Sequence, residues 1–399
     1  MAGNTEVVVI GGGYAGVLAA NRLTRRHDVA VTLINPRPDF VERLRLHQLV
    51  GGTDDAVVGY RDILAERVRL VVDTVTRIDA AGRGLELASG GTVGYDYLIY
   101  AVGSGGIAPD VPGAAEYAHQ IATFEDAQRL RAVLDVAPAT APVTVVGAGP
   151  AGVEAASELA EAGRNVTLVC GGVLGPYLHP RGRRSVARRL AGLGVTVVDG
   201  PDTTVTGVTR HAVRLGDGRE LPSRVTVWTT GFGVPDLAAR SGLGTDALGR
   251  LLTDETLTSM DDPRIAAAGD SAAPSDLPYR MGCQSAVQLG QQAAETVLSR
   301  IAGEQPAPVH VGFAGLCVSL GRRAGIFQFA RRHDVAIGLH LGGRPGAKLK
   351  EFVVRQTVDQ MAYEARKPGA RDRWVKDGKR QELLRTRRAE APAAGERAA

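Results

Sequence analysis

Two stretches of the sequence share one pattern and decide the fold. Residues 7–23 read VVVIGGGYAGVLAANRL, and residues 143–159 read VTVVGAGPAGVEAASEL. Each has a β-branched apolar run, a GxGxxG motif, and then small and aliphatic residues at helical spacing. A further apolar run follows each stretch, at residues 29–34 and 165–169, and completes a strand–helix–strand unit. A single GxGxxG motif is weak support, but two in this context predict two Rossmann-type dinucleotide-binding folds.

The glycines of the two motifs have distinct physical tasks. The first permits the tight turn from strand to helix, the second lets a diphosphate approach the backbone, and the third lets the helix pack on its strand. The diphosphate would lie on the free amides at the helix N-terminus. These positions are Gly11, Gly13 and Gly16 in the first motif and Gly147, Gly149 and Gly152 in the second. The alternative, ordinary glycine turns of an α/β sheet, is much weaker for a pair of motifs than for one.

Three other segments end on glycine after an apolar run. They are YDYLIYAVGS at residues 95–104, RVTVWTTGFG at 224–233 and RIAAAGDS at 264–271. The last segment ends on Gly-Asp, which can present a backbone amide to a phosphate and the Asp270 carboxylate to a ribityl hydroxyl. An Asx turn at the end of a strand is the alternative for that segment.

Composition places the chain among globular proteins and excludes several classes. Its 399 residues suffice for two or three domains, with 44% hydrophobic and 23% charged residues. A net charge of +4 and 5% aromatic residues argue against a nucleic-acid partner. No apolar stretch suits a transmembrane helix, and the N-terminus has no signal-peptide pattern. The three cysteines are too far apart for a disulfide framework or a metal site, which favours a reducing cytoplasm and no metal.

The order of these motifs resembles that of the flavoproteins with two dinucleotide-binding domains, and it is most similar to the type II NADH dehydrogenases. The resemblance covers about residues 5–300. It implies an α/β fold with two Rossmann-type domains, the second inserted in the first, and a C-terminal α+β region. The implied FAD-binding domain spans 1–112 and 246–305, the NAD(P)H-binding domain 113–245, the C-terminal region 306–388 and a disordered tail 389–399.

The resemblance also implies which residues contact the two cofactors. FAD would be held by Gly11, Gly13, Tyr14, Ala15, Gly16, Asn35, Pro36, Arg37, Arg43, Val75, Gly103 and Asp270. NAD(P)H would be held by Gly147, Gly149, Pro150, Ala151, Gly152, Cys170, Gly231 and Phe232.

Two of these positions depart from the family pattern. The residue after the second strand is usually acidic and binds the ribose hydroxyls, but here it is Asn35 in the first repeat and Cys170 in the second. Asn35 can still make neutral hydrogen bonds, whereas Cys170 cannot replace a carboxylate. The basic cluster of Arg181, Arg183 and Arg184 either reaches a 2′-phosphate or forms a solvated helix start. We expect NADH to be preferred to NADPH.

The segment CQSAVQ at residues 283–288 is similar to the family's quinone-site motif AQxAxQ, with Cys283 replacing the first alanine. Gln284 and Gln288 are four residues apart, so they share a helix face, and their amides could bond an acceptor carbonyl. Surface glutamines are the alternative. The first domain has no redox cysteine pair, which excludes glutathione-reductase-like chemistry.

Two further residues are candidates for the catalytic site. Glu154 matches a glutamate that the family has near the nicotinamide and flavin; a first-turn glutamate favoured by the helix dipole is the alternative. His47 is a candidate proton donor to the acceptor, and a structural histidine is the alternative.

The C-terminal quarter has a different character. Short apolar runs at residues 309–341 suggest a β-hairpin. From Arg344 onward the chain has fifteen Lys or Arg against eight Asp or Glu, and Phe352, Val353, Met361 and Ala362 suggest one apolar helix stripe. Such a helix can rest on an anionic membrane surface or pack in a homodimer, and both alternatives stay open.

The resemblance, together with the residues that carry it, implies an FAD-dependent oxidoreductase that takes a hydride from NAD(P)H and reduces a quinone or another small organic acceptor. A slow NADH-oxidising flavoprotein with a signalling role, as in the apoptosis-inducing-factor branch, is one alternative. A flavin oxidase or monooxygenase that uses O₂ is another. The expected location is the cytoplasm, with peripheral contact on the inner face of the membrane as an option.

Overall fold

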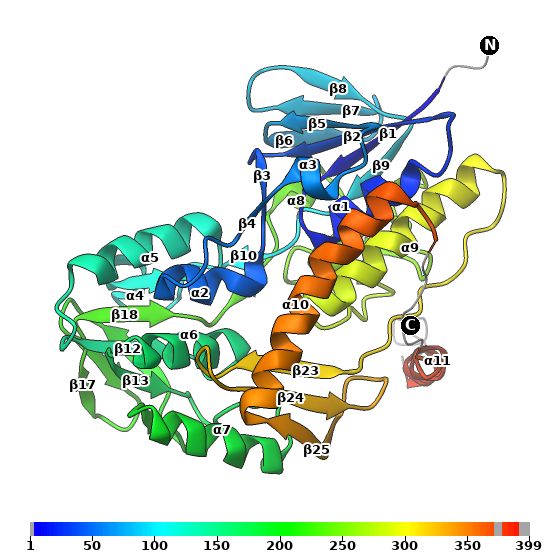
Figure 1. The fold of residues 1–399 in the computed structure, drawn as a ribbon. Helices are drawn as coiled ribbons and strands as arrows, with labels where there is room; N and C mark the ends of the chain where they lie inside the picture. The colour runs from blue at the N-terminus through cyan, green and yellow to red at the C-terminus, as the bar shows by residue number, and fades with distance from the viewer. Residues whose placement is uncertain (1–3, 371–376, 391–399) are drawn as a thin grey trace, which may run out of the picture.

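Two five-stranded parallel sheets organise the chain, and each contains one of the two repeats (Figure 1). The computed structural model describes residues 4–370 and 377–390. The first sheet has the order β21 (Ile265–Ala267), β9 (Tyr97–Tyr100), β1 (Thr5–Ile10), β2 (Val29–Asn35) and β5 (Val68–Val72). The second has the order β11 (Ala118–Gln120), β18 (Val225–Trp228), β12 (Pro142–Val146), β13 (Asn165–Val169) and β14 (Thr196–Val198).

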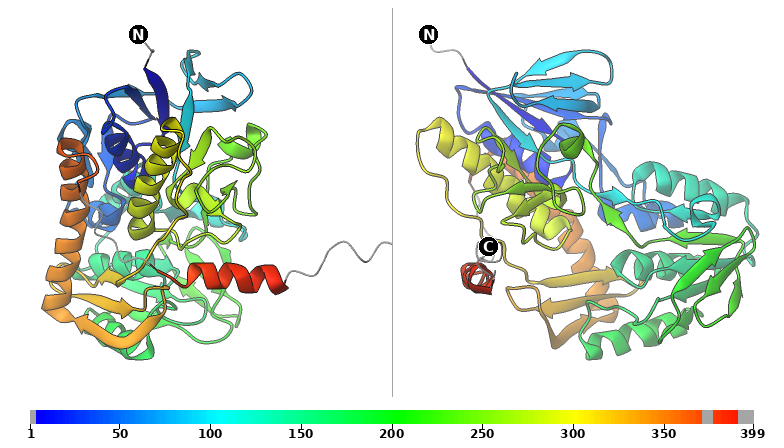
Figure 2. Two further views of the ribbon diagram at one scale, coloured as in Figure 1. Left: turned by 90° about the vertical axis from the view of Figure 1, so that its right-hand side faces the viewer. Right: turned by 180° about the vertical axis from the view of Figure 1, so that it is seen from behind.

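The second Rossmann domain is an insertion in the first. β9 and β21 are hydrogen-bonded neighbours in the first sheet, yet the chain between them builds the whole second sheet. The outgoing and returning segments pair as the short strands β10 (Gly105–Gly106) and β19 (Phe232–Gly233). The two lobes are clear from behind in Figure 2. The expected fold class is therefore confirmed, while the exact domain boundaries stay a prediction.

Helices cover the faces of both sheets. Three helices pack beside the first sheet: α1 (Tyr14–Leu23) contacts both α9 (Cys283–Ile301) and α10 (Gly343–Arg366). α1 and α9 approach each other closely, because a Cβ on Gly290 would overlap the Ala15 carbonyl oxygen. The second lobe has α5 (Phe124–Val136), α6 (Pro150–Glu161) and α7 (Pro180–Gly192), and α2 (Leu46–Gly51) packs on α5 and α6. Shorter helices are η1 (Arg43–Arg45), α3 (Tyr60–Ile63), α4 (Ala114–Tyr117), α8 (Leu237–Arg240) and η2 (Gly269–Ser271).

Small sheets complete the two lobes. Antiparallel meanders are formed by β6 (Val75–Asp79), β7 (Gly84–Leu87) and β8 (Thr92–Gly94), and by β15 (Val205–Val208), β16 (Ala212–Leu215) and β17 (Glu220–Pro222). Two-stranded pairs are formed by β3 (Asp39–Val41) with β4 (Val57–Gly59), and by β20 (Leu251–Thr253) with β22 (Ala272–Pro274).

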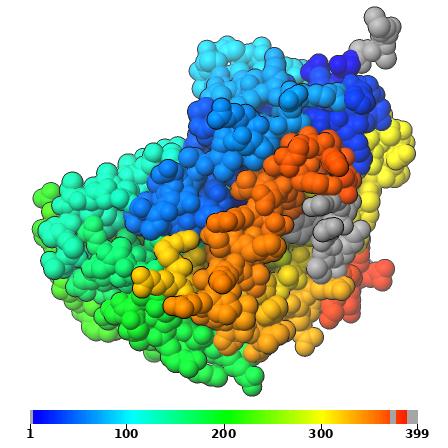
Figure 3. Space-filling view, in the orientation of Figure 1, coloured from blue at the N-terminus to red at the C-terminus, as the bar shows by residue number. Residues whose placement is uncertain are grey.

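The C-terminal region differs from two sequence expectations. The expected hairpin is a three-stranded antiparallel sheet of β23 (Gly315–Ser319), β24 (Gly325–Ala330) and β25 (Ala336–Gly342), because β24 pairs on both edges. The expected single apolar stripe on α10 is wrong: Met361 is fully buried against the core, whereas Phe352 is 58% exposed. Figure 3 shows α10 as a band across one face of the molecule, between the first domain and the C-terminal sheet.

A last helix, α11 (Arg380–Glu390), includes the first two residues of the expected tail, and residues 391–399 of that tail lie outside the described residues. Within residues 4–370 and 377–390, no helix is long and apolar enough to cross a bilayer.

Candidate active site

The turn of the first repeat is shaped for close approach of a ligand to the backbone. Gly11 has a φ of +100°, and a Cβ on Gly16 would overlap the Gly11 carbonyl oxygen. A Cβ on Gly13, in contrast, would meet no described atom within 4 Å. Gly13 precedes α1, whose first amides receive no side-chain cap from the described part of the chain. The free amides and the open space beside Gly13 fit an anionic diphosphate.

The second repeat has the same geometry. Gly147 has a φ of +111°, and a Cβ on Gly152 would overlap the Gly147 carbonyl oxygen. Gly149 has open space beside it and precedes Pro150, the first residue of α6; no described side chain caps this helix either. α5, by comparison, begins with a capping box at Thr123. The two motif helices therefore keep their N-terminal amides available for a ligand.

Asn35 and Arg37 have structural partners that the sequence did not indicate. Asn35 Oδ1 accepts a hydrogen bond from the Gly12 amide at 2.9 Å, and its Nδ2 donates to the Arg37 carbonyl at 2.9 Å. The Arg37 guanidinium binds Glu125 of α5 at 2.6 Å and 2.5 Å. The neutral amide thus holds the glycine turn against the end of β2, and Arg37 ties the first lobe to the second.

Four other predicted FAD contacts lie in α1, directly after β2 and in β6. Tyr14 and Ala15 are buried in the first turn of α1, and the Tyr14 ring meets Phe40 edge-on with centroids 5.1 Å apart. Pro36 directly follows β2, and Val75 begins β6 with its side chain in the core.

Asp270 lies at the centre of a small polar cluster at the carboxyl edge of the first sheet. Its Oδ2 accepts from the Ser104 hydroxyl at 2.7 Å, and its Oδ1 accepts from the Gly282 amide at 2.9 Å. Arg43 Nη1 is 4.0 Å from Oδ2 and donates to Ser104 at 3.2 Å. A Cβ on the neighbouring Gly103, at a φ of +71°, would meet no described atom within 4 Å. Open backbone beside a fixed carboxylate fits a ligand with hydroxyl and phosphate groups.

A cavity of about 780 Å³ lies next to this cluster. Its wall comes from the start of α6, the loop before α9, the first turn of α9, β23 with the residues before it, and α10. The lining includes Pro150, Glu154, Arg280, Cys283, Gln284, Phe313, Cys317, Lys350, Phe352 and Tyr363. Four of these chain regions are far apart in sequence, so the cavity is a product of the tertiary fold.

Gln284 and Gln288 have different positions relative to this cavity. Gln284 lines it, and its amide donates to the Gly315 carbonyl at 3.2 Å and accepts from the Ala314 amide at 3.1 Å. Gln288 is buried behind the wall, where its amide bonds the Gln284 carbonyl at 2.8 Å and both the carbonyl and the amide of Gly312 at 3.1 Å and 3.2 Å. Of the predicted pair, only Gln284 faces the cavity; Gln288 holds the chain that precedes β23.

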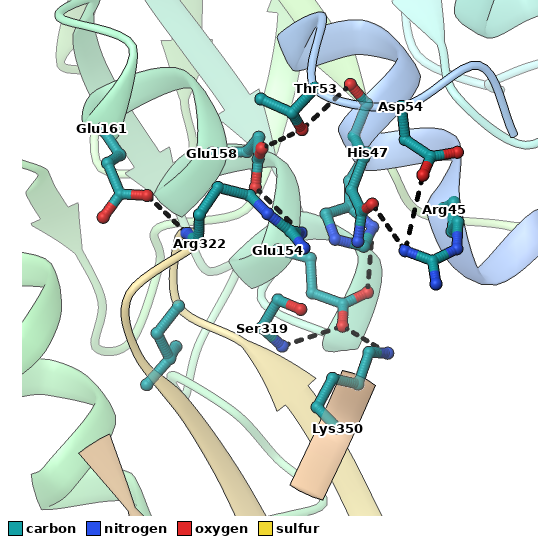
Figure 4. A network of polar contacts seen from close by, with 12 residues as sticks. Arg45, His47, Thr53, Asp54, Glu154, Glu158, Glu161, Ser319, Arg322 and Lys350 are labelled. Carbon is teal, nitrogen blue, oxygen red and sulfur yellow. Dashed lines mark hydrogen bonds and ion pairs between the residues drawn. The ribbon is translucent and has the colours of Figure 1, made fainter. Parts of the chain in front are cut away.

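Glu154 lies in a buried cluster that joins three parts of the chain (Figure 4). Its carboxylate is 2.9 Å from Lys350 Nζ of α10, accepts from the Ser319 amide of β23 at 2.9 Å, and lies 3.6 Å from His47 Nδ1 of α2. The alternative of an exposed first-turn glutamate is wrong, because Glu154 is only 8% exposed.

The charges in this cluster stabilise one another. Burial alone would raise the pKa of Glu154, but Lys350, His47 and the Ser319 amide outweigh it and lower that pKa. Burial alone would lower the pKa of Lys350, but the Glu154 carboxylate in particular raises it well above its ordinary value. The cavity wall therefore carries an ammonium group and a carboxylate at neutral pH.

His47 does not have the position that the sequence suggested. It lies behind Glu154 and is absent from the cavity lining among the described residues. Burial, with Lys350, Arg322 and Arg45 nearby, lowers the pKa of His47 to about 4, although Glu154 acts in the opposite direction. A neutral imidazole away from the cavity cannot donate a proton to an acceptor there, so the structural interpretation of His47 is the one that holds.

The remaining residues predicted to contact NAD(P)H lie in or next to the second lobe and differ in their surroundings. Cys170 directly follows β13, and burial and the nearby Asp199 raise its pKa to about 12. Gly231 has a φ of +82°, and Phe232 is 41% exposed at the domain crossing. Arg181 is the second residue of α7 and lies close to Gly338 of β25, which supports the interpretation of its cluster as a helix start.

Lys350 is the main site residue that sequence analysis missed. It was one of many cations in the basic C-terminal segment, where most charges are solvated. Its spacing from Val354 and Met361, four and then seven residues, is that of one helix face, and all three are buried. A lysine on the apolar face of an amphipathic helix was the available signal.

Fold and site together define a class of protein: an FAD-dependent oxidoreductase with separate domains for the flavin and the nicotinamide cofactor. Residues 5–296 match the family of pyridine nucleotide-disulphide oxidoreductases. The chain belongs to this family, which confirms the expected family, cofactors and enzyme class.

Relatives and solved structures agree with this assignment. The chain is 30% identical over 348 residues to a type II NADH:quinone oxidoreductase of Mycobacterium tuberculosis, covering 76% of this chain and 74% of the relative. It is 29% identical over 355 residues to an NADH dehydrogenase-like protein of the same species, covering 81% and 87%. In fold it resembles NDH2 of Plasmodium falciparum, with a TM-score of 0.74, 17% identity and coverage of 92% and 99%.

Replacing the open glycines separates the two cofactor sites. We expect Gly13→Val to abolish FAD binding. Gly149→Val should keep FAD but raise the KM for NADH about tenfold or more. In each variant the new side chain fills space that a diphosphate needs. FAD content, measured from visible absorbance and from the flavin released by denaturation, and steady-state kinetics check this. The wild-type protein should release one FAD. Release of FMN, or equal FAD content in both variants, would contradict the assignment.

The buried neutral His47 makes stability depend on pH. Unfolded histidine binds a proton below about pH 6.5, whereas folded His47 does so only near pH 4. Stability is therefore lost as pH falls through this window, by up to about 3 kcal/mol. Urea unfolding at pH 7 and pH 5 should show a smaller loss for His47→Gln than for the wild type or for the surface control His27→Gln. An unchanged loss in His47→Gln would disprove this explanation.

Proposed function

We propose that the protein is an NADH:quinone oxidoreductase whose acceptor binds in the cavity between the start of α9, β23 and α10. The single observation that carries this proposal is the joint presence on the cavity wall of the Gln284 amide and the Lys350–Glu154 pair. An amide and an ammonium group are suitable partners for the two carbonyl oxygens of a quinone. The phenylalanine and aliphatic lining suits its apolar ring and tail.

The residues of the glycine turns and of the Asp270 cluster would hold FAD, which when bound accepts a hydride from the nicotinamide and passes two electrons to the acceptor. Asp270, fixed by Ser104 and the Gly282 amide, would orient the ribityl chain. The loop that binds Asp270 continues into the first turn of α9, so flavin position and cavity wall are linked through the backbone.

Lys350 and Glu154 would act on the acceptor side. The Lys350 ammonium group can donate a hydrogen bond to a quinone oxygen and stabilise the negative charge that develops there. Glu154 keeps that ammonium group charged and fixed at 2.9 Å. Glu154 also belongs to the first turns of α6, so it lies between the proposed nicotinamide site and the cavity.

NADH is the proposed donor. Asp199, which follows β14, is close enough to affect the Cys170 thiol, so its carboxylate can supply the negative charge that Cys170 lacks. A carboxylate there would repel a 2′-phosphate and favour NADH. This preference is measured as the ratio of kcat/KM for NADH to kcat/KM for NADPH, in the same steady-state experiments that test Gly149→Val.

The proposed location is the cytoplasmic face of the membrane. Exposed apolar side chains occur on and next to β25 and on α10, at Val335, Leu339, Leu341 and Phe352. Phe352 also lines the cavity, so a quinone in the membrane would have a short route to it. The competing proposal is that these side chains form a homodimer contact, which would cover the same surface.

The role of Gln284 can be separated from flavin reduction. In stopped-flow experiments, Gln284→Ala should slow reoxidation of the reduced enzyme by quinone about tenfold and leave its reduction by NADH unchanged, because only the acceptor cavity is altered. Gln292→Ala, two turns further along α9 and away from the cavity, is the matched control. If both half-reactions match the wild type in Gln284→Ala, the cavity is not the acceptor site.

Membrane contact and dimerisation predict different results for one pair of substitutions. If the apolar side chains contact lipid, Leu339→Asp with Phe352→Asp should abolish sedimentation with anionic vesicles, because charged groups resist transfer to the apolar interface. Val136→Asp, at an 85% exposed site on the other lobe, is the control. Loss of a dimer in equilibrium sedimentation, with vesicle binding unchanged, would favour the dimer contact. Deleting α10 is unsuitable, because it would remove Lys350 from Glu154.

A further inference from the structure

Arg380, the first residue of α11, has an unusually complete set of partners for a C-terminal arginine. Its guanidinium binds both oxygens of Glu255 at 2.8 Å and 2.9 Å. It also donates to the carbonyls of Leu277 and Pro274 at 3.0 Å and 2.9 Å, and it lies 4.3 Å from the centroid of the Tyr279 ring. The side chain is 5% exposed. Figure 2 shows α11 at the edge of the body, pointing outward. Arg380 makes the buried contacts at its beginning, and Arg387 further along the helix binds Asp276 at the surface.

The turn that Arg380 holds is strained. Ser275 and Asp276 have φ values of +51° and +50°, in the left-handed region that residues with a Cβ rarely adopt. The two carbonyls that bind Arg380 flank this pair directly, one on each side. Strained turns persist only where surrounding contacts stabilise them. Arg380 supplies such contacts from outside the turn.

The same loop continues into the wall of the cavity. Arg280, Met281 and Gly282 line it, and the Gly282 amide binds Asp270. Arg280 is itself held by Asp334 at 2.5 Å and 3.0 Å. Tyr279 packs on the main hydrophobic core beneath the loop. Only a few residues therefore separate the Arg380 contacts from the groups that shape the cavity.

We propose that Arg380 is a positioning residue for the acceptor half-reaction: its buried contacts at the beginning of α11 act as a strap that holds the loop at residues 274–282 as one wall of the acceptor cavity. This inference rests on the proposed function only in taking the cavity as the acceptor site. Arg380 touches neither cofactor site, so it acts through the loop. Its planar guanidinium group binds a carboxylate and two carbonyls at once, which the single ammonium group of a lysine cannot do with the same geometry.

Arg380→Ala should raise the KM for a short-chain quinone about tenfold and leave flavin reduction by NADH within about twofold of the wild type. It should also accelerate labelling of Cys283 by a neutral maleimide, because Cys283 directly follows the loop and lines the same cavity, so a displaced loop would open access to the thiol. Arg380→Lys should be intermediate, since it keeps the charge without the planar guanidinium group. Glu255→Gln tests the same Arg380–Glu255 contact by removing the charge of the carboxylate instead of the guanidinium group.

Arg387→Ala is the matched control, because Arg387 lies on the same helix and binds Asp276 of the same loop, but at an exposed position. It should leave quinone kinetics and Cys283 labelling unchanged. Wild-type quinone KM and labelling in a folded, FAD-containing Arg380→Ala protein would overturn the proposal, as would equal slowing of both half-reactions. If the wild type fails to reduce quinones, the proposed function fails, and the labelling comparison still tests the strap.

Discussion

The buried ion pair between Lys350 and Glu154 is the interaction on which the active-site arrangement depends. Both side chains are at most 10% exposed and 2.9 Å apart, and they belong to α10 and α6, which come from different regions of the chain. Removing either partner would leave an uncompensated buried charge, at a cost of about 3–5 kcal/mol. This penalty holds the C-terminal helix in one position against the second Rossmann domain.

A second buried pair holds the other end of α10. Arg22 of α1 binds Glu364 at 2.7 Å, and Asn21 donates to the Met361 carbonyl at 3.1 Å. α10 is therefore attached to the first Rossmann domain near its C-terminus and to the second near its N-terminus. The cavity lies along the segment between these attachments, so its shape follows from the relative position of the two domains.

The cavity separates two kinds of chemistry within one enzyme. The glycine turns leave backbone amides open to an anionic diphosphate, and this needs only local geometry. The wall of the proposed acceptor cavity instead combines the Lys350 ammonium group and the Gln284 amide with many apolar side chains, with His47 kept neutral behind Glu154. Such a wall favours an uncharged ring compound whose oxygens become negative on reduction.

The sequence by itself determined the local features: two strand–turn–helix units, the glycines that shape their turns, and Asp270 at the end of a strand. Each depends on residues within a few positions of one another, so spacing and residue type suffice to predict it. Only the tertiary structure decided that Gln284 faces the cavity while Gln288 binds Gly312, that His47 lies behind Glu154, and that Lys350 is buried. These outcomes depend on contacts between segments far apart in the chain, and burial, which sets both orientation and pKa, has no local signature in the sequence.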